Sequence, residues 1–253
     1  MGMLLTDRVA LVTGAAQGLG EGIADLFSRE GATVALCDLK PEGERVAALI
    51  ARKTGRRAKF YRLDVSRREE IAAVVRAVDA DFGRIDVLVN CAGVCQPTPL
   101  LEMTEQIWDA HHNVNVKGPF FLCQEVCRIM VKKGGCKIVN IASDSGVAAF
   151  PDESAYSSSK AALIALTRVI AKDMGVHGIY CNAVCPGAIM TPLLREVYLT
   201  GPEKEKEFAA ATALNRIAQP EDIARVVLFL ASSLSDHVTG EHIFATAGGV
   251  MSQ

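Results

Sequence analysis

The stretch RVALVTGAAQGLGEGIADLF, residues 8–27, decides the fold of this chain of 253 residues. Its first part, RVALVT, is a short apolar run rich in valine, which is typical of a buried β-strand. Gly14, Gly18 and Gly20 then mark a tight turn, and the amphipathic run that starts at Gly18 predicts a helix. A strand, a glycine-rich turn and a helix in this order form the first unit of an α/β sheet.

The rest of the chain repeats this alternation. Near-continuous apolar runs predict strands at 8–13, 33–38, 58–63, 86–90, 137–142, 179–184 and 242–247. Helical periodicity between them predicts helices at about 18–30, 42–54, 67–82, 104–132, 153–175 and 220–231. Strands this apolar are buried on both faces, as in a parallel sheet covered by helices. No linker or repeat divides the chain, so we expect one Rossmann-type domain over 1–253, an α/β doubly wound parallel sheet of seven strands.

Composition excludes several classes of function. Half of the residues are apolar and the net charge is −2, which argues against disorder and against nucleic-acid binding. No run approaches the length of a membrane span, and the start MGMLLTDRVALVTG has no long apolar segment typical of a secretory signal. None of the eight cysteines has CxxC spacing, so we expect reduced, buried thiols, no metal site and a cytoplasmic location.

The turn TGAAQGLG, residues 13–20, predicts a phosphate-binding loop. Its glycines let a pyrophosphate approach the backbone, and the helix that follows directs its N-terminus at the phosphates. The turn lacks the Lys and Ser/Thr of an ATPase loop. Asp38 ends the second strand, 24 residues after Gly14, where a carboxylate accepts hydrogen bonds from ribose hydroxyls and repels a 2′-phosphate. Gln17 and Leu39 offer no cation to such a phosphate, so we predict NAD; Lys40 leaves NADP open.

A second candidate pattern is YSSSK, residues 156–160. Tyr156 and Lys160 lie four apart, so a helix brings the phenol and the ammonium to one face. The ordinary pKa of a phenol is near 10, but an adjacent ammonium and the positive nicotinamide ring favour the phenolate, which makes Tyr156 a candidate acid or base. Alone, such a pair is usually a packed ring and a surface charge. Ser143, 13 residues earlier, ends a predicted strand at the sheet edge where ligands bind.

Several motifs together resemble the short-chain dehydrogenase/reductase family. TGAAQGLG, NCAG, NVKG, Ser143, YSSSK and PGAIMT occur in the order and spacing of that family, over essentially the whole chain. The resemblance implies a catalytic tetrad of Asn115, Ser143, Tyr156 and Lys160. Tyr156 would exchange the substrate proton, Ser143 would hold the same oxygen, Lys160 would bind the nicotinamide ribose and lower the pKa of Tyr156, and Asn115 would hold a water.

The resemblance also implies a cofactor site. Asp64 and Val65 would meet adenine, and residues 90–93 the adenosine side; the segment PGAIMT would hold the nicotinamide carboxamide. The expected cofactor contacts are Thr13, Gly14, Gln17, Gly18, Leu19, Gly20, Asp38, Leu39, Asp64, Val65, Asn90, Ala92, Gly93, Tyr156, Lys160, Pro186, Gly187, Ile189 and Thr191. Two departures from the family pattern are Cys91, where NNAG has its second Asn, and Ala247, where VDGG has Asp.

The substrate side is less defined. The irregular stretch 186–215 follows a strand end and contains the charge cluster GPEKEKE, so we expect a substrate lid at about 188–215, with a solvated surface helix as the alternative. The candidate pocket consists of Val94, Cys95, Gln96, Ser143, Asp144, Ser145, Phe150, Tyr156, Ala188 and the lid around Leu193–Tyr198.

These features favour an NAD-dependent oxidoreductase for a small secondary alcohol, polyol or hydroxysteroid-like substrate and its ketone. The alternative is a 3-oxoacyl-thioester (acyl-carrier-protein) reductase, and a more distant one is a non-catalytic NAD-binding regulator. We expect a small-molecule partner, no nucleic acid and no membrane. The resemblance implies a homotetramer or a dimer that pairs the fourth and fifth helices, with Phe120, Phe121, Val126 and Met130 as candidate contacts.

Overall fold

The computed structural model describes residues 2–251 and contains one seven-stranded sheet. Its strands are β1 (Val9–Thr13), β2 (Thr33–Asp38), β3 (Ala58–Arg62), β4 (Val87–Asn90), β5 (Cys136–Ile141), β6 (Ile179–Pro186) and β7 (His242–Ala245). Every neighbouring pair is parallel, in the order β3-β2-β1-β4-β5-β6-β7. The order reverses direction at β1 and β4, so a crevice opens there at the carboxyl ends of the strands.

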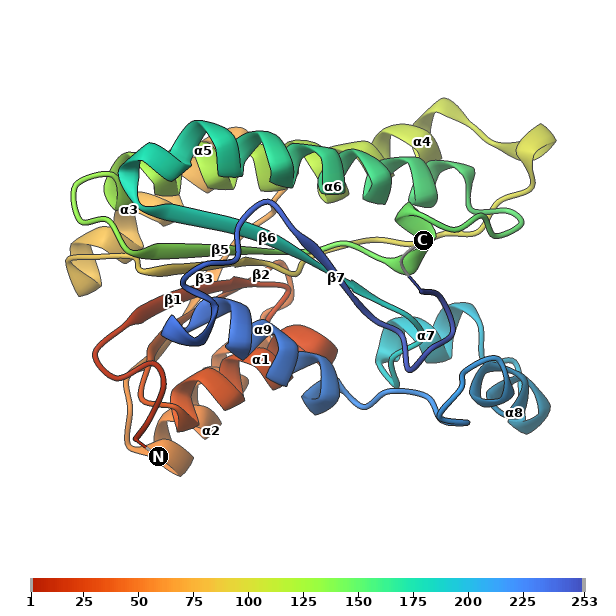
Figure 1. Ribbon diagram of the computed structural model, residues 1–253, viewed down its shortest axis with the longest axis horizontal. Helices are drawn as coiled ribbons and strands as arrows, with labels where there is room; N and C mark the ends of the chain where they lie inside the picture. Colours follow the sequence, from red (N-terminus) through yellow and green to blue (C-terminus); the bar gives the residue numbers. More distant parts are fainter. Residues whose placement is uncertain (1, 252–253) are drawn as a thin grey trace.

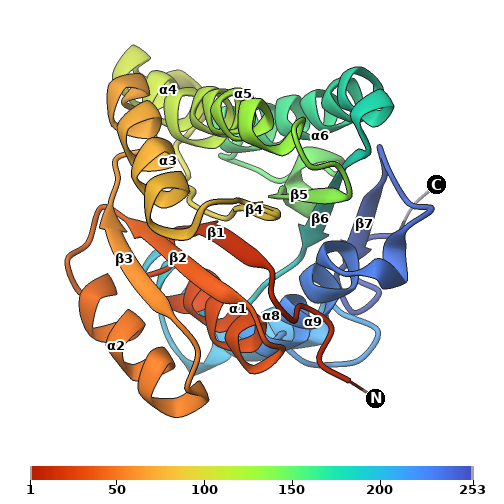
Figure 2. The same ribbon diagram turned by 90° about the vertical axis from the view of Figure 1, so that its left-hand side faces the viewer.

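Helices cover both faces of the sheet, as the apolar strands predicted (Figures 1 and 2). One face carries α1 (Gly18–Arg29), α2 (Gly43–Thr54) and α9 (Pro220–Ala231). The other carries α3 (Arg68–Phe82), α4 (Glu105–His112), α5 (Gly118–Met130) and α6 (Ser154–Met174). Short 3₁₀ turns occupy Leu100–Glu102, Asp144–Gly146, Gly175–His177 and Ser233–Ser235. The predicted doubly wound α/β fold is confirmed.

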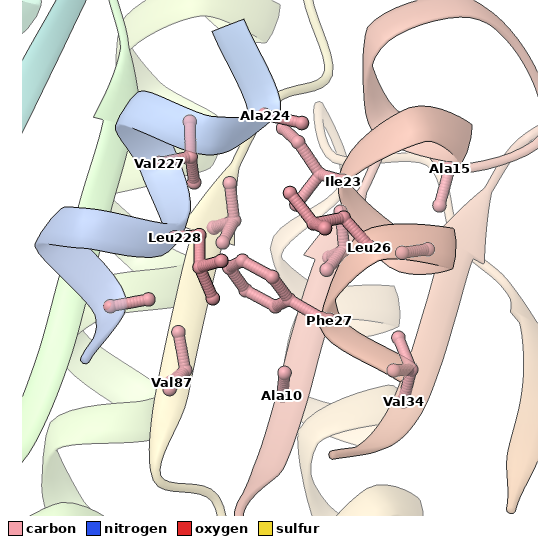
Figure 3. Close-up of a cluster of buried hydrophobic side chains, with 14 of the residues drawn as sticks. Ala10, Ala15, Ile23, Leu26, Phe27, Val34, Val87, Ala224, Val227 and Leu228 are labelled. Carbon is pink, nitrogen blue, oxygen red and sulfur yellow. The ribbon is translucent and has the colours of Figure 1, made fainter. Parts of the chain in front are cut away.

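The core beneath α1 and α9 shows how the helices are held (Figure 3). Phe27 and Ile23 of α1 interlock with Val227 and Leu228 of α9 above the buried Ala10 of β1. Burying side chains of this size contributes about 1.5–3 kcal/mol each. A second apolar cluster fills the opposite face, between the sheet and α3, α5 and α6.

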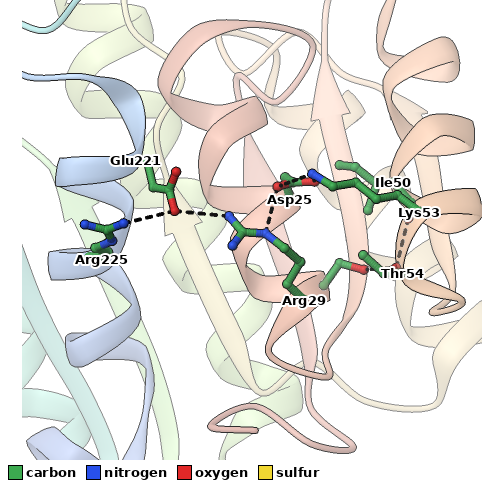
Figure 4. A network of polar contacts seen from close by, with 8 residues as sticks. Asp25, Arg29, Ile50, Lys53, Thr54, Glu221 and Arg225 are labelled. Atoms are coloured by element: carbon green, nitrogen blue, oxygen red, sulfur yellow. Dashed lines mark hydrogen bonds and ion pairs between the residues drawn. The ribbon is translucent and has the colours of Figure 1, made fainter.

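Charged side chains link the outer surfaces of the same helices (Figure 4). Asp25 lies 3.0 Å from Arg29 and 2.9 Å from Lys53 of α2, and Glu221 of α9 lies 3.5 Å from Arg29. Exposed pairs contribute about 0.2–1 kcal/mol each. The apolar core therefore holds the helices, and the surface network adds little.

The expected single helix over 104–132 is wrong. Between α4 and α5 the residues Asn113–Lys117 form a π-helical segment, in which Gly118 N–H donates to the Asn113 carbonyl, five residues back. The physical cause is Pro119, which has no N–H for the carbonyl four residues before it. Asn115 lies within this π-helical turn, and its side chain is fully buried.

The expected irregular stretch 186–215 is also corrected. It contains two short helices, α7 (Pro192–Val197) and α8 (Pro202–Ala210), each with a proline in its first turn. Proline suits that position because its missing N–H has no helical partner there. The Thr191 hydroxyl caps α7 by accepting from Leu194 N–H at 3.4 Å.

Two further expectations concern packing. All eight cysteines are free, and seven of them are buried while Cys91 is half-buried, as expected for reduced thiols. Val126 and Met130, offered as oligomer contacts, are fully buried in the core, so they are unavailable to a partner; Phe120 is exposed. Within residues 2–251, no helix combines the length and apolar character that a membrane crossing needs.

Candidate active site

A cavity of about 740 Å³ opens at the carboxyl edge of the sheet. Its walls come from the loops after β1 to β6, from α7 and α8, and from the segment after β7. This volume lies within the usual range for small-molecule sites. Among the described residues, no group of three or more His, Cys, Asp or Glu is arranged to hold a metal ion.

The glycine turn between β1 and α1 forms one end of this cavity. Gly14 has a positive φ of 66°, and a Cβ there would meet the Ala92 backbone at 2.9 Å. A Cβ on Gly20 would lie 2.1 Å from the Gly14 carbonyl oxygen, so any side chain would break the turn. Gln17, Gly18, Leu19 and Gly20 line the cavity beside the start of α1. Together they make a cradle that fits a pyrophosphate at a helix N-terminus.

Asp38 stands at the end of β2 in a fixed orientation. Its two carboxylate oxygens accept hydrogen bonds from the N–H groups of Ala16 and Lys40, both at 2.9 Å. The Lys40 ammonium donates to the Gln17 side chain at 3.1 Å. Asp38 therefore faces the groove as an immobile acceptor, which fits the ribose hydroxyls of a dinucleotide.

The loops after β3 and β4 continue the groove. Asp64, Val65, Ala92 and Gly93 line it together with Leu39. Burial opposes the charge on Asp64, but hydrogen bonds from Ser66 and the nearby Arg67 outweigh it and lower the pKa of this carboxyl. Asp64 is thus a fixed anion beside the site.

Two predicted cofactor residues lie behind the wall of the cavity. The Thr13 hydroxyl is buried and accepts hydrogen bonds from the N–H groups of Cys91 and Ala92, at 3.0 and 3.1 Å. Asn90 donates to the Asn140 side chain of β5 at 2.8 Å. Thr13 thus positions the loop after β4, Asn90 links β4 to β5, and neither residue lines the groove.

The segment after β6 forms the wall opposite the glycine turn. Pro186, Gly187, Ala188, Ile189 and Thr191 all line the cavity. Ile189 pairs with Ala218 in an isolated parallel bridge, and Met190 N–H donates to the Ala218 carbonyl at 2.8 Å. This pairing fixes the segment, and a Cβ on Gly18 would be only 3.4 Å from Thr191.

Lys160 lies on α6 with its ammonium inside the protein. The residue is 4% exposed, and its Nζ donates to the Ile141 carbonyl at the end of β5, at 2.8 Å. Burial lowers the pKa of Lys160 to about 8. The ammonium therefore loses and gains its proton close to neutral pH.

Asn115 anchors the same region from the π-helical segment. Its Oδ1 accepts from Val94 N–H, and its Nδ2 donates to the Val94 carbonyl and to the Ser159 hydroxyl, each at 3.0 Å. A Cβ on Gly93 would lie 3.3 Å from Asn115 Oδ1 and 3.5 Å from Lys160 Nζ. Asn115 thus positions the loop after β4 against α6 through three hydrogen bonds.

Ser143 and Tyr156 bring two hydroxyls to the cavity. Ser143 follows β5, lines the cavity and donates to Asp144 Oδ1 at 3.1 Å. Tyr156 lies in the first turns of α6, and the Ser143 hydroxyl is close enough to lower its pKa by hydrogen bonding. The structure therefore brings together all four expected tetrad residues, three of them along the cavity wall and Asn115 behind it.

The protein groups around Tyr156 together raise its pKa, and the lowering expected from Lys160 with the nicotinamide ring stays a prediction. Burial raises its pKa, and the neighbouring Cys95, Glu153 and Asp144 act in the same direction. Lys160 does not reverse this shift, because its Nζ is directed at the Ile141 carbonyl and lies 5.6 Å from the centre of the Tyr156 ring. Tyr156 accordingly carries its proton at neutral pH.

The substrate end of the cavity holds most of the expected residues. Val94, Cys95, Asp144, Ser145, Phe150 and Ala188 line it, as do Leu193, Leu194 and Tyr198 of the lid. Gln96 does not: it is exposed outside the cavity, and its N–H donates to His111 at 3.0 Å. Phe208, Ala211 and Thr212, within the predicted lid, also line the cavity; the residues at this end that the sequence did not indicate are Pro151, Glu153, Thr246, Gly249 and Val250.

Glu153 is the missed residue with the clearest signal. It precedes α6 and lies three positions before Tyr156, so helical spacing places it on the same side as the phenol. Its carboxyl accepts a hydrogen bond from the Tyr198 hydroxyl. Spacing from Tyr156 could have drawn attention to Glu153, whereas the partner Tyr198 depends on the path of the lid.

Comparisons with known proteins agree with this geometry. A family model described as enoyl-(acyl carrier protein) reductase matches residues 14–250. The 3-oxoacyl-[acyl-carrier-protein] reductase FabG of Thermotoga maritima is 40% identical over 252 residues, covering 98% of this chain and 100% of its own. The NAD-dependent glycerol dehydrogenase of Listeria innocua is 36% identical over 246 residues, covering 96% and 94%.

A solved structure gives the same result for the fold. A short-chain type dehydrogenase/reductase from Mycobacterium ulcerans superimposes with a TM-score of 0.92 at 28% identity, covering 97% of this chain and 90% of its own. The family match over most of the chain, and relatives well above 30% identity along nearly its whole length, show that this chain belongs to the short-chain dehydrogenase/reductase family of oxidoreductases.

Proposed function

We propose that this chain interconverts a secondary alcohol and its ketone with NAD(H), using Tyr156 as the general acid or base. The observation that carries the proposal is the placement of the Ser143 and Tyr156 hydroxyls side by side in a cavity that also contains the glycine turn. A dinucleotide held over that turn would supply the ring that gives or takes the hydride.

Tyr156 and Ser143 would act on one oxygen of the substrate. With a raised pKa, Tyr156 is protonated and ready to donate to a ketone oxygen as it gains negative charge. In the opposite direction the same group takes the alcohol proton, which requires its pKa to fall. A cationic nicotinamide ring beside the phenol would have that effect. Ser143 would hold the oxygen in place, and such acid or base catalysis is typically worth about 10² to 10⁴ in rate.

Lys160 and Asn115 would support that proton transfer. A pKa of about 8 lets Lys160 exchange a proton near neutral pH, and the ammonium would also bind the nicotinamide ribose. The Asn115 side chain already makes three hydrogen bonds, which leaves it one acceptor position, on Oδ1. The backbone carbonyl of Asn115 is the better candidate for binding the expected water, because Pro119, four residues later, has no N–H to donate to it.

Asp38 supports NAD rather than NADP. A 2′-phosphate beside this fixed carboxylate would place like charges together, at a cost of several kcal/mol. Lys40, whose ammonium donates to Gln17 at 3.1 Å, is exposed and leaves NADP as a weaker alternative. Because about 1.4 kcal/mol is tenfold, we expect NAD to be favoured by more than tenfold in kcat/KM.

Reduction of a 3-oxoacyl thioester is the second candidate. It is favoured by the name of the Thermotoga maritima relative, which is 40% identical along nearly the whole chain. The carboxyls of Asp144 and Glu153 at the substrate end weigh against it, because a thioester and its ketone offer these groups acceptors only.

Three further proposals concern the lid, the cellular location and the oligomeric state. The lid at about 188–215 closes over the substrate end through α7 and α8. The protein acts in the cytoplasm, supported by its eight free cysteines, and forms a homo-oligomer, supported by the exposed Phe120 of α5 and Trp108 of α4.

The experiment is a substrate panel on the purified chain. Secondary alcohols, their ketones and a 3-oxoacyl thioester are assayed by nicotinamide absorbance with NAD(H) and NADP(H). We expect turnover of alcohols and ketones with NAD(H), and a fall of at least tenfold in the NAD preference in Asp38→Asn. Turnover of the thioester alone would favour the second candidate, and no turnover of any substrate would refute the proposal.

A further inference from the structure

The lid is anchored at its two ends and has few buried contacts between them. Its first end is fixed by the bridge between Ile189 and Ala218, and at its last end Leu214 N–H donates to the Ala247 carbonyl at 3.2 Å. Between these anchors α7 buries Leu194, and α8 buries no residue. Segments with so few buried apolar contacts open at a low cost in free energy. The two lid helices therefore depend on another contact to stay over the cavity.

That contact is the side chain of Tyr198, which follows α7. Its hydroxyl donates to a carboxyl oxygen of Glu153 and lies 3.2 Å from the Cys95 thiol. Both partners belong to the fixed wall of the cavity, because Cys95 follows β4 and Glu153 precedes α6. Within the described residues, these are the hydrogen bonds that connect residues 193–210 to the protein outside the lid. One residue thus ties the middle of the lid to the wall.

The protons of this contact have one consistent arrangement. A carboxylate only accepts hydrogen bonds, so the Tyr198 hydroxyl donates to Glu153. Burial raises the pKa of Tyr198, and it also raises the pKa of Cys95 to about 11, so both groups keep their protons near neutral pH. The Cys95 thiol can then donate to the Tyr198 oxygen. The hydroxyl makes both bonds at once, and a phenyl ring without it could make neither.

Glu153 depends on the same hydroxyl. The residue is 7% exposed, and its second carboxyl oxygen is buried without a hydrogen-bond partner among the described residues. A buried carboxyl that loses its last hydrogen bond bears the full cost of desolvation. Removal of the Tyr198 hydroxyl therefore destabilises the closed lid. In an open lid, water takes the place of the hydroxyl at the first carboxyl oxygen.

The contact reaches both lid helices. The Tyr198 ring packs edge-on against Phe208 of α8, with the ring centroids 5.8 Å apart. Both rings line the cavity, together with Leu193 and Leu194 of α7. Because the two rings are packed together, a movement of Tyr198 away from Glu153 displaces α7 and α8 together.

We propose that Tyr198 is a latch: its hydrogen bonds to Glu153 and Cys95 hold α7 and α8 closed over the substrate end, and their breakage opens that end to substrate and solvent. This inference rests on the proposed function and concerns access to the same site. A closed lid excludes water from the Ser143 and Tyr156 hydroxyls, and the latch sets how often the cavity opens. Tyr198 is thus a positioning residue, outside the proton transfer itself.

The test is hydrogen–deuterium exchange of the purified chain, measured by mass spectrometry on peptides that cover residues 193–210. Tyr198→Phe removes only the hydroxyl and should accelerate exchange of these amides by at least tenfold, because a hydrogen bond to a charged group has about that effect. Glu153→Ala should give a similar increase. Glu153→Gln should give a smaller one, because an amide oxygen still accepts from the phenol. In the double variant Tyr198→Phe/Glu153→Ala the two increases should not multiply.

The matched control is Tyr180→Phe, near the amino end of β6 and beside Lys137. It removes a tyrosine hydroxyl at the opposite edge of the sheet and should leave exchange of residues 193–210 unchanged. Thermal unfolding checks that every variant is folded. Unchanged exchange in Tyr198→Phe, or an equal increase in the strands of the core, would overturn the latch.

Kinetics separate this inference from the proposed function. If the chain oxidises an alcohol, Tyr198→Phe should raise the KM for that alcohol by a larger factor than it changes kcat, because Tyr156 and Ser143 stay in place. If no alcohol or ketone is turned over, the proposed function fails, while the exchange comparison still decides the latch. A loss of kcat with KM and exchange unchanged would place Tyr198 in the chemical step and refute the latch.

Discussion

Two buried lysines place their ammonium groups at opposite ends of β5, and their surroundings differ. Lys137, at the amino end, has its Nζ 2.8 Å from Asp236 and 3.6 Å from the centre of the Tyr180 ring. Lys160 donates to the Ile141 carbonyl at the carboxyl end, and no described carboxylate pairs with it. At the amino ends of the strands, which we call the amino edge, the buried lysine is paired with a carboxylate. At their carboxyl ends, the carboxyl edge, the buried lysine has only a carbonyl partner.

The acids of the two edges repeat this contrast. Asp86, at the amino edge, is buried and accepts from Val9 N–H at 2.8 Å and from the guanidinium groups of Arg8 and Arg84. Glu153, at the carboxyl edge, keeps one oxygen without a partner. A buried polar atom without a partner reduces stability, in contrast to the fully paired carboxylate of Asp86. Mutations at the amino edge should therefore reduce stability, whereas mutations at the carboxyl edge should reduce activity.

The largest expected effect is on activity at the carboxyl edge. Tyr156→Phe removes the hydroxyl that moves the proton, and we expect kcat/KM to fall by about 10² to 10⁴. Dinucleotide binding should persist, because the glycine turn and Asp38 are untouched. Steady-state kinetics and fluorescence titration with NADH measure the two properties. Activity within a few-fold of the wild-type value would remove Tyr156 from the mechanism.

The next effect is on stability at the amino edge. Asp86→Ala leaves Val9 N–H and two guanidinium groups without their acceptor, and we expect the free energy of unfolding to fall by about 3 kcal/mol. Urea unfolding measures it. The matched control is Asp25→Ala, in the exposed network of Figure 4, where the loss should be below about 1 kcal/mol. Equal losses would show that burial does not distinguish the two acids.

Lys160→Met should abolish turnover and yet stabilise the folded chain at pH 7. The pKa of Lys160 is about 8 when folded and 10.5 ordinarily, so its burial cost is fully present below pH 8. Between those values the unfolded chain binds more protons, so wild-type stability rises with pH. Each pKa unit is about 1.4 kcal/mol, and the lost hydrogen bond offsets part of it, which leaves a gain of about 2 kcal/mol.

This gain should shrink as the pH rises from 8 towards 10.5. Lys137→Met is the matched comparison, and it should lose about 1–2 kcal/mol because it breaks an ion pair and a cation–π contact. Urea unfolding of both variants at pH 7 and at a pH near 10 supplies the data. A Lys160→Met variant less stable than the wild type at pH 7 would contradict the contrast between the lysines.

The smallest effect concerns the segment after β7. Ala247, at the position where the family has Asp, adopts a positive φ of 53°, which disfavours an L side chain. Ala247→Gly should raise the free energy of unfolding by about 0.5–1 kcal/mol. Ala209→Gly within α8 is the control and should lower it by about as much. A loss of stability in Ala247→Gly would show that the turn tolerates alanine without strain.

Residues with a local pattern could be located from the sequence. Gly14 follows a strand, Asp38 ends one, and Tyr156 and Lys160 share a helix face, so strand ends and helical spacing sufficed. Their side-chain directions did not follow from the pattern. Thr13 faces a loop instead of the groove, and Lys160 is directed at a carbonyl instead of the phenol, because hydrogen bonds from distant strands decide both.

Contacts between distant segments were beyond the sequence argument. Tyr198 and Glu153 are 45 positions apart, and Cys95 and Tyr198 are 103 apart. Their meeting depends on the path of α7 and α8, which periodicity predicted only as an irregular lid. Gln96 was predicted in the pocket beside Cys95, but its side chain is exposed outside the pocket. Its backbone N–H donates to the buried His111.

The most direct test is a crystal structure of the chain with NADH and a ketone that it reduces. We expect the ketone oxygen within about 2.6–3.2 Å of both the Tyr156 and the Ser143 hydroxyls, with the dinucleotide pyrophosphate over the glycine turn. A ketone bound away from both hydroxyls, or a dinucleotide bound elsewhere, would contradict the assignment of the carboxyl edge as the reactive end of this sheet.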